Sequence, residues 1–112
     1  MCSRYSLTSP HEAVRAYFGY DNEAEFPPRY NIAPSQPVAV VRNDAQGRRE
    51  MALVRWGLVP AWVKDPREFK MLINARAETA ADKPSFRAAM RHRRCLVPVS
   101  YTHLTLPTKR IV

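Results

Sequence analysis

The sequence predicts an α+β domain with a mostly antiparallel, barrel-like β-sheet and short flanking helices. The chain has 112 residues, which is enough for one domain at most. Two β-rich runs, residues 36–42 and 48–56, are separated by a loop that ends in Gly47, a pattern typical of a hairpin. Helical patterns at residues 10–18 and 84–94 lie before and after these runs. A chain of this length has little core to spare, so each element is needed.

The first helix is predicted from its end signals. Ser9 can cap the first turn, Pro10 suits the first helical position, and Glu12 completes a capping box. Gly19 predicts the end of the helix. We expect one apolar face of this helix to pack in the core, through Val14, Tyr17 and Phe18.

The second half of the chain predicts another helix and two further strands. The helix begins near Pro84 and ends in the cationic residues 91–94, which suit the helix dipole. Its inward face carries Phe86, Ala89 and Met90. A short strand is expected over residues 70–76. The apolar residues 95–99 predict a buried strand, in which Cys95 would be an unreactive core thiol.

The charge of the chain is strongly positive and unevenly placed. Eighteen Lys and Arg residues against ten Asp and Glu give a formal net charge of +8. Residues 29–98 hold fourteen of the basic residues and six of the acidic ones. Such an excess favours polyanions such as nucleic acid, because neutralised phosphates release counterions. Charge alone leaves open the alternative of a merely soluble basic surface.

Composition also argues against several classes of protein. The longest apolar run, residues 37–41, is far shorter than the ~20 residues of a membrane helix. Polar residues interrupt the N-terminal segment, so we expect no signal peptide and a cytoplasmic location. Two cysteines and three scattered histidines lack metal-ligand spacing, and three glycines form no phosphate loop. We therefore expect a monomer without a metal or a cofactor.

Cys2 is the most informative residue for chemistry, because it becomes the N-terminus if Met1 is removed. The product carries an α-amine and a thiol on adjacent carbons. An aldehyde can condense with the amine as a Schiff base, and the thiol can then close a thiazolidine ring. With a reference pKa near 7.7 to 8.0, this amine is roughly 10 to 15% neutral at pH 7, whereas a lysine is only ~0.04% neutral.

Four sequence blocks occur in order along the chain, and two shorter ones follow them. The blocks are MCSRY (1–5), RYNIAPSQ (29–36), RWGLVPAW (55–62), INARAET (73–79), Ser85-Phe86 and RCLVP (94–98). The series closely resembles the SOS response-associated peptidase family, the SRAP domain, over residues 1–98. The resemblance implies that the N-terminal cysteine forms a thiazolidine cross-link with the ring-opened aldehyde of an abasic site, preferentially in single-stranded DNA. Some members also release an N-terminal extension autoproteolytically.

The resemblance also implies roles for particular residues. Cys2 would be the nucleophile, through both its amine and its sulfur. Asn74 would lie beside it and hold the abasic sugar or the reacting amine, although an amide that bonds its own backbone is the alternative. Arg4 and Arg76 would hold the phosphates that flank the lesion, rather than being simply solvated. Asn31 would support this set.

A second group would contact bases or orient the first group. Trp62 would be a wedge or stacking platform beside the lesion, aided by Pro34, or else a packing residue. For Trp56, inside the predicted strand, core packing is preferred. Glu78 could orient Arg76 by pairing on one side of a strand, or could form an ordinary salt bridge.

The sequence departs from the family pattern after residue 98. Members continue with a segment of the form Ala-Asp-Gly-Phe-Tyr-Glu-Trp, whose glutamate serves as acid/base, whereas here Val99-Ser100-Tyr101 follows. A histidine from a second half of the family domain is also expected near the lesion, and His103 does not stand in its motif. Ser3 replaces the usual glycine, which would add strain if that position needs a positive φ. We therefore expect an incomplete sheet and slow cross-linking.

Residues 99–112 predict a tail that does not belong to the family. The segment has no acidic residue and no helical period, and it resembles a translated sequencing-adaptor tail. We therefore expect the coding sequence to be cut off inside the domain. Two alternatives to cross-linking stay open: a non-catalytic basic nucleic-acid-binding module, and an inactive truncated fragment. A peptidase that acts on other proteins is least favoured, because no Cys/His/Asn triad can be assembled.

Overall fold

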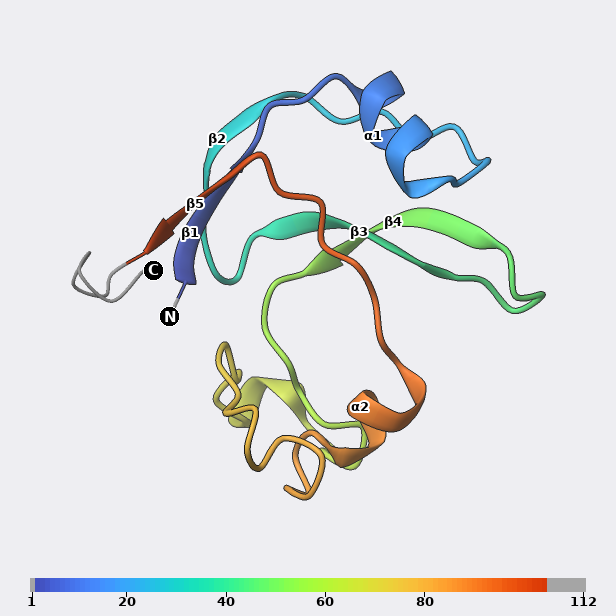
Figure 1. Cartoon of the computed structure of the whole chain (residues 1–112). Helices are drawn as coiled ribbons and strands as arrows, with labels where there is room; N and C mark the ends of the chain where they lie inside the picture. Colours follow the sequence, from blue (N-terminus) through green and yellow to red (C-terminus); the bar gives the residue numbers. More distant parts are fainter. Residues whose placement is uncertain (1, 105–112) are drawn as a thin grey trace.

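The computed structural model describes residues 2–104, which form an α+β arrangement of two antiparallel sheets (Figure 1). The three-stranded sheet has the order β2-β1-β5, and the two-stranded sheet pairs β3 with β4. The strands are β1 (Cys2–Leu7), β2 (Arg29–Ile32), β3 (Pro37–Asn43), β4 (Arg49–Arg55) and β5 (Tyr101–Leu104). The predicted class is confirmed, but the described strands make two separate sheets and no closed barrel-like one, because no strand ladder joins the two.

The helix α1 (His11–Phe18) ends where the sequence predicts. Gly19 adopts the left-handed conformation with φ 71°, and its N–H donates to the carbonyl of Arg15 at 2.8 Å. Only glycine takes this backbone geometry without a steric cost. The exposure of the helix differs from expectation, because Val14 is buried while Tyr17 is 83% exposed.

The start of α1 is a correction to the predicted capping box. Pro10 occupies the N-cap, and no side chain caps the helix. The hydroxyl of Ser9 lies 3.0 Å from the hydroxyl of Ser100 instead, and Ser100 Oγ also accepts the backbone N–H of Thr8 at 3.0 Å. The Ser9 hydroxyl, which was expected to cap the helix, therefore bonds Ser100, which lies 91 residues away in the sequence.

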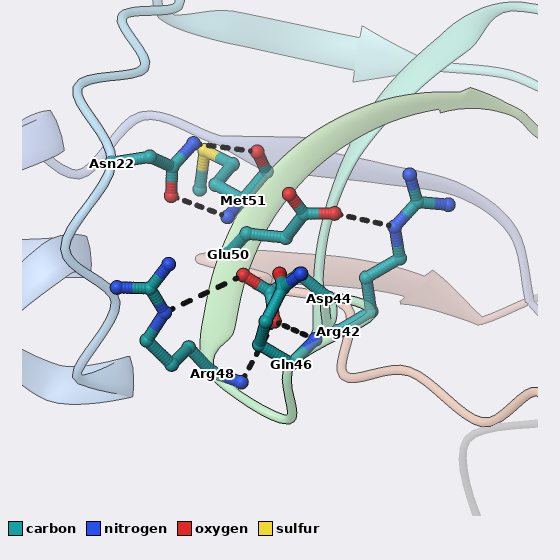
Figure 2. Close-up of polar contacts among 7 residues, drawn as sticks. All are labelled: Asn22, Arg42, Asp44, Gln46, Arg48, Glu50 and Met51. Atoms are coloured by element: carbon teal, nitrogen blue, oxygen red, sulfur yellow. Dashed lines mark hydrogen bonds and ion pairs between the residues drawn. The ribbon is translucent and has the colours of Figure 1, made fainter.

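The β3–β4 hairpin forms as predicted, in a continuous register from Pro37↔Arg55 to Asn43↔Arg49. Asp44 fixes its loop, since Asp44 Oδ1 accepts the backbone N–H groups of Gln46 and Arg48, both at 2.9 Å (Figure 2). Gly47 completes the loop with φ 81°, a value that disfavours other residues.

The hydrophobic core lies between the two sheets and α1. Its buried members are Tyr5, Leu7, Val14, Tyr20, Ile32, Val38, Ala39, Val40, Val41 and Met51. Asn22 holds β4 against this core with two hydrogen bonds of 2.9 Å (Figure 2). Its amide nitrogen donates to the carbonyl of Met51, and its amide oxygen accepts the N–H of the same residue.

The segment from residue 57 to residue 98 is more irregular. It contains the 3₁₀ helix η1 (Pro66–Glu68) and the short helix α2 (Arg87–His92), which lies below the sheets in Figure 1. The strand predicted over 70–76 is reduced to one bridge, Leu58↔Leu72. The helix predicted from Pro84 begins three residues later, at Arg87.

The buried strand predicted at residues 95–99 is wrong. This segment makes one isolated bridge, Val41↔Leu96, and Leu96 is 52% exposed. Cys95 is exposed as well, so it is not a core thiol. The physical reason is that β3 covers the segment on one side only, and no second described strand pairs with it.

β5 lies within the segment that the sequence sets apart from the family. It pairs with β1 in the register Arg4↔His103, Tyr5↔Thr102 and Ser6↔Tyr101. The rest of that predicted tail, residues 105–112, lies outside the described residues. None of the helices in residues 2–104 combines the length and the hydropathy that crossing a bilayer requires.

Candidate functional site

Cys2 is the first residue of β1, where its backbone pairs with that of Leu104. The register shifts between Cys2 and Arg4, so the start of the strand is irregular. The position of the Cys2 thiol and that of Met1 lie outside the described part of the chain. Among the described non-glycine residues, Ser35 is the one with a positive φ, so Ser3 adds no strain of that kind.

Arg4 and Asn31 come together from neighbouring strands of the three-stranded sheet. The guanidinium Nη1 of Arg4 donates to Asn31 Oδ1 at 3.3 Å, and both side chains are exposed. A neutral amide oxygen orients the guanidinium without cancelling its charge. Arg4 therefore keeps the capacity to bind an anion such as phosphate.

The turn that carries Pro34 is tied to the end of β4. Ser35, with φ 73°, donates its N–H to the carbonyl of Trp56 at 2.8 Å, and Trp56 donates its N–H to the carbonyl of Gln36 at 3.0 Å. The side-chain oxygen of Gln36 accepts from Arg29 Nη2 at 2.7 Å. These contacts fix the position of Pro34, whose side chain is half-buried.

Trp56 packs against the core, which is the alternative that the sequence favoured for it. Its ring lies 5.5 Å from the ring of Tyr5, measured between centroids, at an interplanar angle of 56°. Tyr5 directly follows Arg4 in β1. The Tyr5–Trp56 contact therefore connects the strand that carries Arg4 to the turn that carries Pro34.

Asn74 lies beside the same end of β4. Leu58 and Leu72 exchange backbone hydrogen bonds of 2.8 and 3.0 Å in an antiparallel bridge, which brings the residues after Leu72 beside those before Leu58. Asn74, Trp56 and Leu58 line one hollow of about 360 Å³. The Asn74 side chain is exposed and has no hydrogen-bond partner among residues 2–104, so the alternative of an amide bonded to its own backbone is not observed.

Gly57 is a positioning residue that sequence reasoning missed. It has φ 148°, and a Cβ at this position would lie 2.7 Å from Met71 Sδ. The backbone conformation therefore favours glycine here, and a Cβ would also have to displace the Met71 side chain. The signal in the sequence was a glycine directly after the β-rich run of residues 48–56.

Arg76 and Glu78 do not form the predicted pair. The segment is a turn, in which the carbonyl of Arg76 accepts the N–H of Thr79 at 3.2 Å and that of Ala80 at 2.9 Å. Both charged side chains are exposed, and no ion pair joins them in the described part of the chain. A pairing on one side of a strand fails because no strand forms there.

Trp62 is presented to solvent in the loop before η1. Its ring is 62% exposed and meets Phe69 edge to face, with centroids 6.0 Å apart. Asp65 holds the loop, because its Oδ1 accepts from the backbone N–H of Arg67 at 3.0 Å and from its Nε at 3.1 Å. These hydrogen bonds from Arg67 lower the pKa of Asp65.

Cys95 is the second cysteine of the chain, so its ionisation decides whether it can compete with Cys2 as a nucleophile. Desolvation raises the pKa of the Cys95 thiol, and the Arg42 guanidinium opposes this only in part. Cys95 is therefore less ionised at neutral pH than an ordinary cysteine.

Within residues 2–104, no three His, Cys, Asp or Glu side chains come together so that they could hold a metal ion.

The contacts bring several of the predicted site residues into one region. Arg4 pairs with Asn31, Tyr5 connects β1 to Trp56, and Trp56 is shared by the Pro34 turn and the hollow that Asn74 lines. Trp62, Arg76 and Glu78 are exposed on the following loops and make no described contact with that group. The roles of all these residues stay predictions.

Comparison with known proteins identifies relatives over most of the chain. The family described as "SOS response associated peptidase (SRAP)" matches residues 1–101. The chain is 42% identical over 101 residues to the abasic site processing protein YoqW of Bacillus subtilis, which covers 88% of this chain and 45% of that protein. It is 31% identical over 102 residues to the abasic site processing protein YedK of Escherichia coli, with 86% and 44% covered.

A mammalian relative and a solved structure agree with this. The abasic site processing protein HMCES of Rattus norvegicus is 32% identical over 120 residues, covering 87% of this chain and 34% of that protein. A crystal structure of a protein from Bordetella bronchiseptica matches with a TM-score of 0.67 and 32% identity, over 88% of this chain and 48% of that one. The chain thus spans less than half the length of these relatives.

Proposed function

Because this chain belongs to the SRAP family, we propose that it processes abasic sites in single-stranded DNA by forming a covalent cross-link at Cys2. The observation that carries the proposal is the family match over residues 1–101, with cysteine at position two. The relatives named above are described as abasic site processing proteins. The basic excess of residues 29–98 also favours a polyanionic partner.

The proposed reaction consumes one aldehyde and releases one water. The neutral α-amine of Cys2 adds to the aldehyde carbon of the ring-opened abasic sugar, and loss of water gives an imine. The Cys2 sulfur then adds to the imine carbon, the imine nitrogen takes up a proton, and the thiazolidine ring is closed. No oxidant or reductant is needed, so the chemistry requires only an exposed N-terminal amine, a thiol and proton transfer.

The neighbouring residues are proposed to bind and position the DNA. Asn74 offers a free amide for the sugar or the amine, and Arg4 offers a guanidinium that Asn31 orients. Arg76 would bind a second phosphate on the other side of the lesion. Trp62, with most of its ring exposed, would stack on a neighbouring base, and the Pro34 turn would limit that space.

The proposal includes the expectation of a slow reaction. Pro98 is followed by Val99-Ser100-Tyr101 where family members carry an acid/base glutamate. A positioned acid/base group typically contributes ~10²- to 10⁴-fold to the rate. We therefore propose that Cys2 reacts more slowly here than in relatives that carry the glutamate. We also propose that the SRAP-like part of the chain ends near Pro98. The Cys2 amine is exposed only when what precedes it is released, by removal of Met1 or by autoproteolysis.

The test is a cross-linking assay with the full chain. Intact mass first establishes whether Met1 is removed, because a retained Met1 leaves no aminothiol and contradicts the mechanism. The chain is then incubated with a single-stranded oligonucleotide that carries one abasic site, and the products are separated on a denaturing gel. We expect a covalent band that Cys2→Ala abolishes and the control Cys95→Ala retains.

The other outcomes identify the alternatives. Salt-sensitive binding that does not depend on the lesion or on Cys2 would indicate a non-catalytic nucleic-acid-binding module. The absence of a cooperative thermal transition in circular dichroism would indicate an inactive fragment. A folded, Met1-free chain that forms no band would contradict the cross-linking proposal.

A further inference from the structure

A second hollow, of about 750 Å³, lies between the β3–β4 hairpin and the end of α2. We call it the basic groove. Its walls come mainly from the hairpin and from residues 91–95, and their acidic and arginine side chains are Arg42, Asp44, Glu50, Arg91, Arg93 and Arg94. From the sequence, the cations of residues 91–94 were expected to act in part structurally, by interacting with the helix dipole. The structure places them opposite the hairpin.

The two carboxylates of the basic groove are already occupied (Figure 2). Asp44 accepts two backbone N–H groups of its own loop, and its Oδ2 lies 3.8 Å from Arg48 Nε. Glu50 Oε1 lies 3.2 Å from Arg42 Nε. Both acids therefore face partners on the hairpin itself and leave the cations across the groove unneutralised.

The cations on the α2 side have no such partners. Arg91 and Arg93 are exposed and make no ion pair or side-chain hydrogen bond with any residue in 2–104. Arg94 Nε donates to the carbonyl of Met90 at 2.7 Å, and this neutral acceptor holds the side chain without cancelling its charge. With four arginines against two carboxylates, the walls of the groove carry a net positive charge.

The basic groove adjoins the hollow that Asn74 lines. Val40, Val54 and Leu58 contribute to the walls of both. An elongated ligand that begins at Asn74 can therefore pass over these apolar residues and reach the arginines without leaving the hairpin surface. A single nucleic-acid strand has this form, because its phosphates are spaced along a chain and its sugars and bases can lie on an apolar floor.

We propose that the basic groove binds backbone phosphates of the same DNA strand, beyond the nucleotide that reaches Asn74. Guanidinium groups suit phosphate, since their paired N–H donors match its oxygens. The groove contacts the backbone and not the lesion, so it binds intact single strands as well. The identity of the ligand rests on the proposed function, whereas the charge of the groove and the wall residues that it shares with the Asn74 hollow do not.

The test compares two double variants of equal charge. Arg91→Gln/Arg93→Gln removes the unpaired cations of the groove, and Lys83→Gln/Arg87→Gln removes two exposed cations of the preceding segment and of α2 that do not line it. Binding of an undamaged, fluorescently labelled strand of about 16 nucleotides, the upper end of the site size of one small binding fold, is measured by anisotropy at several salt concentrations. Thermal melting verifies that both variants remain folded.

We expect the groove variant to bind about tenfold more weakly at low salt, with a salt slope reduced by about 1.4, or about 0.7 for each lost phosphate contact. The control variant should match the parent chain. The difference should shrink for a strand of about four nucleotides, which is too short to occupy both hollows. Equal weakening by both variants, or no binding of intact strands at all, would overturn the inference.

Two further readouts separate this inference from its competitors. Inorganic phosphate that displaces the strand at equal phosphate concentration would reassign the groove to free anions, and preferential binding of a poly-glutamate peptide would reassign it to acidic protein. The groove variant, added in saturating excess, should still cross-link a short abasic strand, because Cys2 is unchanged. A parent chain that binds intact strands through the groove but never cross-links would contradict the proposed function alone.

Discussion

The two halves of the molecule differ in how their residues are used. Residues 2–56 contain α1 and all described strands except β5, and they contribute the whole buried core cluster. Residues 57–98 contribute three buried residues, Pro60, Ala80 and Pro98, but carry Trp62 and most of the unpaired cations. Exposed groups that can bind a ligand are thus most numerous where burial is least, although Cys2 and Arg4 lie in β1, in the first half. The first half therefore supplies the core and the proposed nucleophile, whereas the second half adds mainly exposed groups around them.

The second half depends on the first for its position. The bridge Val41↔Leu96 joins it to β3 of the first half, whereas the bridge Leu58↔Leu72 is internal to the second half. Segments with few buried contacts open more readily than core strands. Substitutions there should change binding or reaction with little effect on the free energy of unfolding, and substitutions of buried core residues in the first half should do the reverse.

The largest expected difference comes from one substitution made in both halves. Ile32 is 2% exposed and Ile73 is 42% exposed. Ile32→Ala should lower the free energy of unfolding by about 2 to 5 kcal/mol, because it leaves a cavity in the core. Ile73→Ala should cost less than about 1 kcal/mol, since the residue is exposed and outside the core cluster. Urea denaturation measures both, and equal losses would show that residues 57–98 are packed as tightly as the sheets.

A second pair of variants separates stability from reaction. Asn22→Ala removes both hydrogen bonds to Met51 and should cost about 1 to 3 kcal/mol of unfolding free energy. Asn74→Ala removes no described hydrogen bond and should stay within about 0.5 kcal/mol. If Asn74 holds the reacting groups, the same variant should reduce the cross-linking rate by about tenfold or more. Unchanged cross-linking by Asn74→Ala would remove Asn74 from the proposed site.

The smallest effect is expected within the core itself. The hydroxyl groups of Tyr5 and Tyr20 are buried and have no hydrogen-bond partner among the described residues. Tyr5→Phe should therefore raise the free energy of unfolding by about 1 kcal/mol, whereas Tyr17→Phe, at an 83% exposed position, should change nothing. A loss of stability in Tyr5→Phe would show that this hydroxyl has a favourable partner.

The same tyrosine predicts a pH dependence. Burial raises the pKa of Tyr5, and Arg29 lowers it only in part. The folded state therefore holds the phenolic proton more tightly than the unfolded state, so this contribution to stability is present below pH ~10 and is lost as the pH rises through the folded pKa. Unfolding measured near neutral pH and above pH ~10 should show a smaller decline in Tyr5→Phe than in the parent chain.

Local chemistry explains which parts of the fold could be predicted. The hairpin follows from Asp44 and Gly47, and the end of α1 follows from Gly19, because a turn or a helix end depends on a few adjacent residues. Ser9 failed as a cap because Ser100, distant in sequence, bonds its hydroxyl. The exposure of Cys95 could not be predicted either, because apolar composition shows only that a strand can be buried and not what covers it.

The candidate site was predicted through motifs rather than through contacts. The blocks around Cys2 and Asn74 identified the family, which the comparisons confirm. They could not predict that Trp56 would link the Pro34 turn to the hollow beside Asn74, because that depends on the Leu58↔Leu72 bridge. The sequence likewise could not predict that residues 91–94 lie across from the hairpin, because their position depends on how residues 57–98 fold.

Asn22 has a consequence for the solubility of the chain. β4 is an edge strand in the described part of the chain, and Met51 turns its N–H and carbonyl away from β3 toward the Asn22 amide. The amide thus occupies the place that the backbone of an added strand would take. An open edge of this kind is where a second molecule can pair and start aggregation. One side chain from a connecting loop therefore blocks the middle of an exposed strand against pairing with another chain.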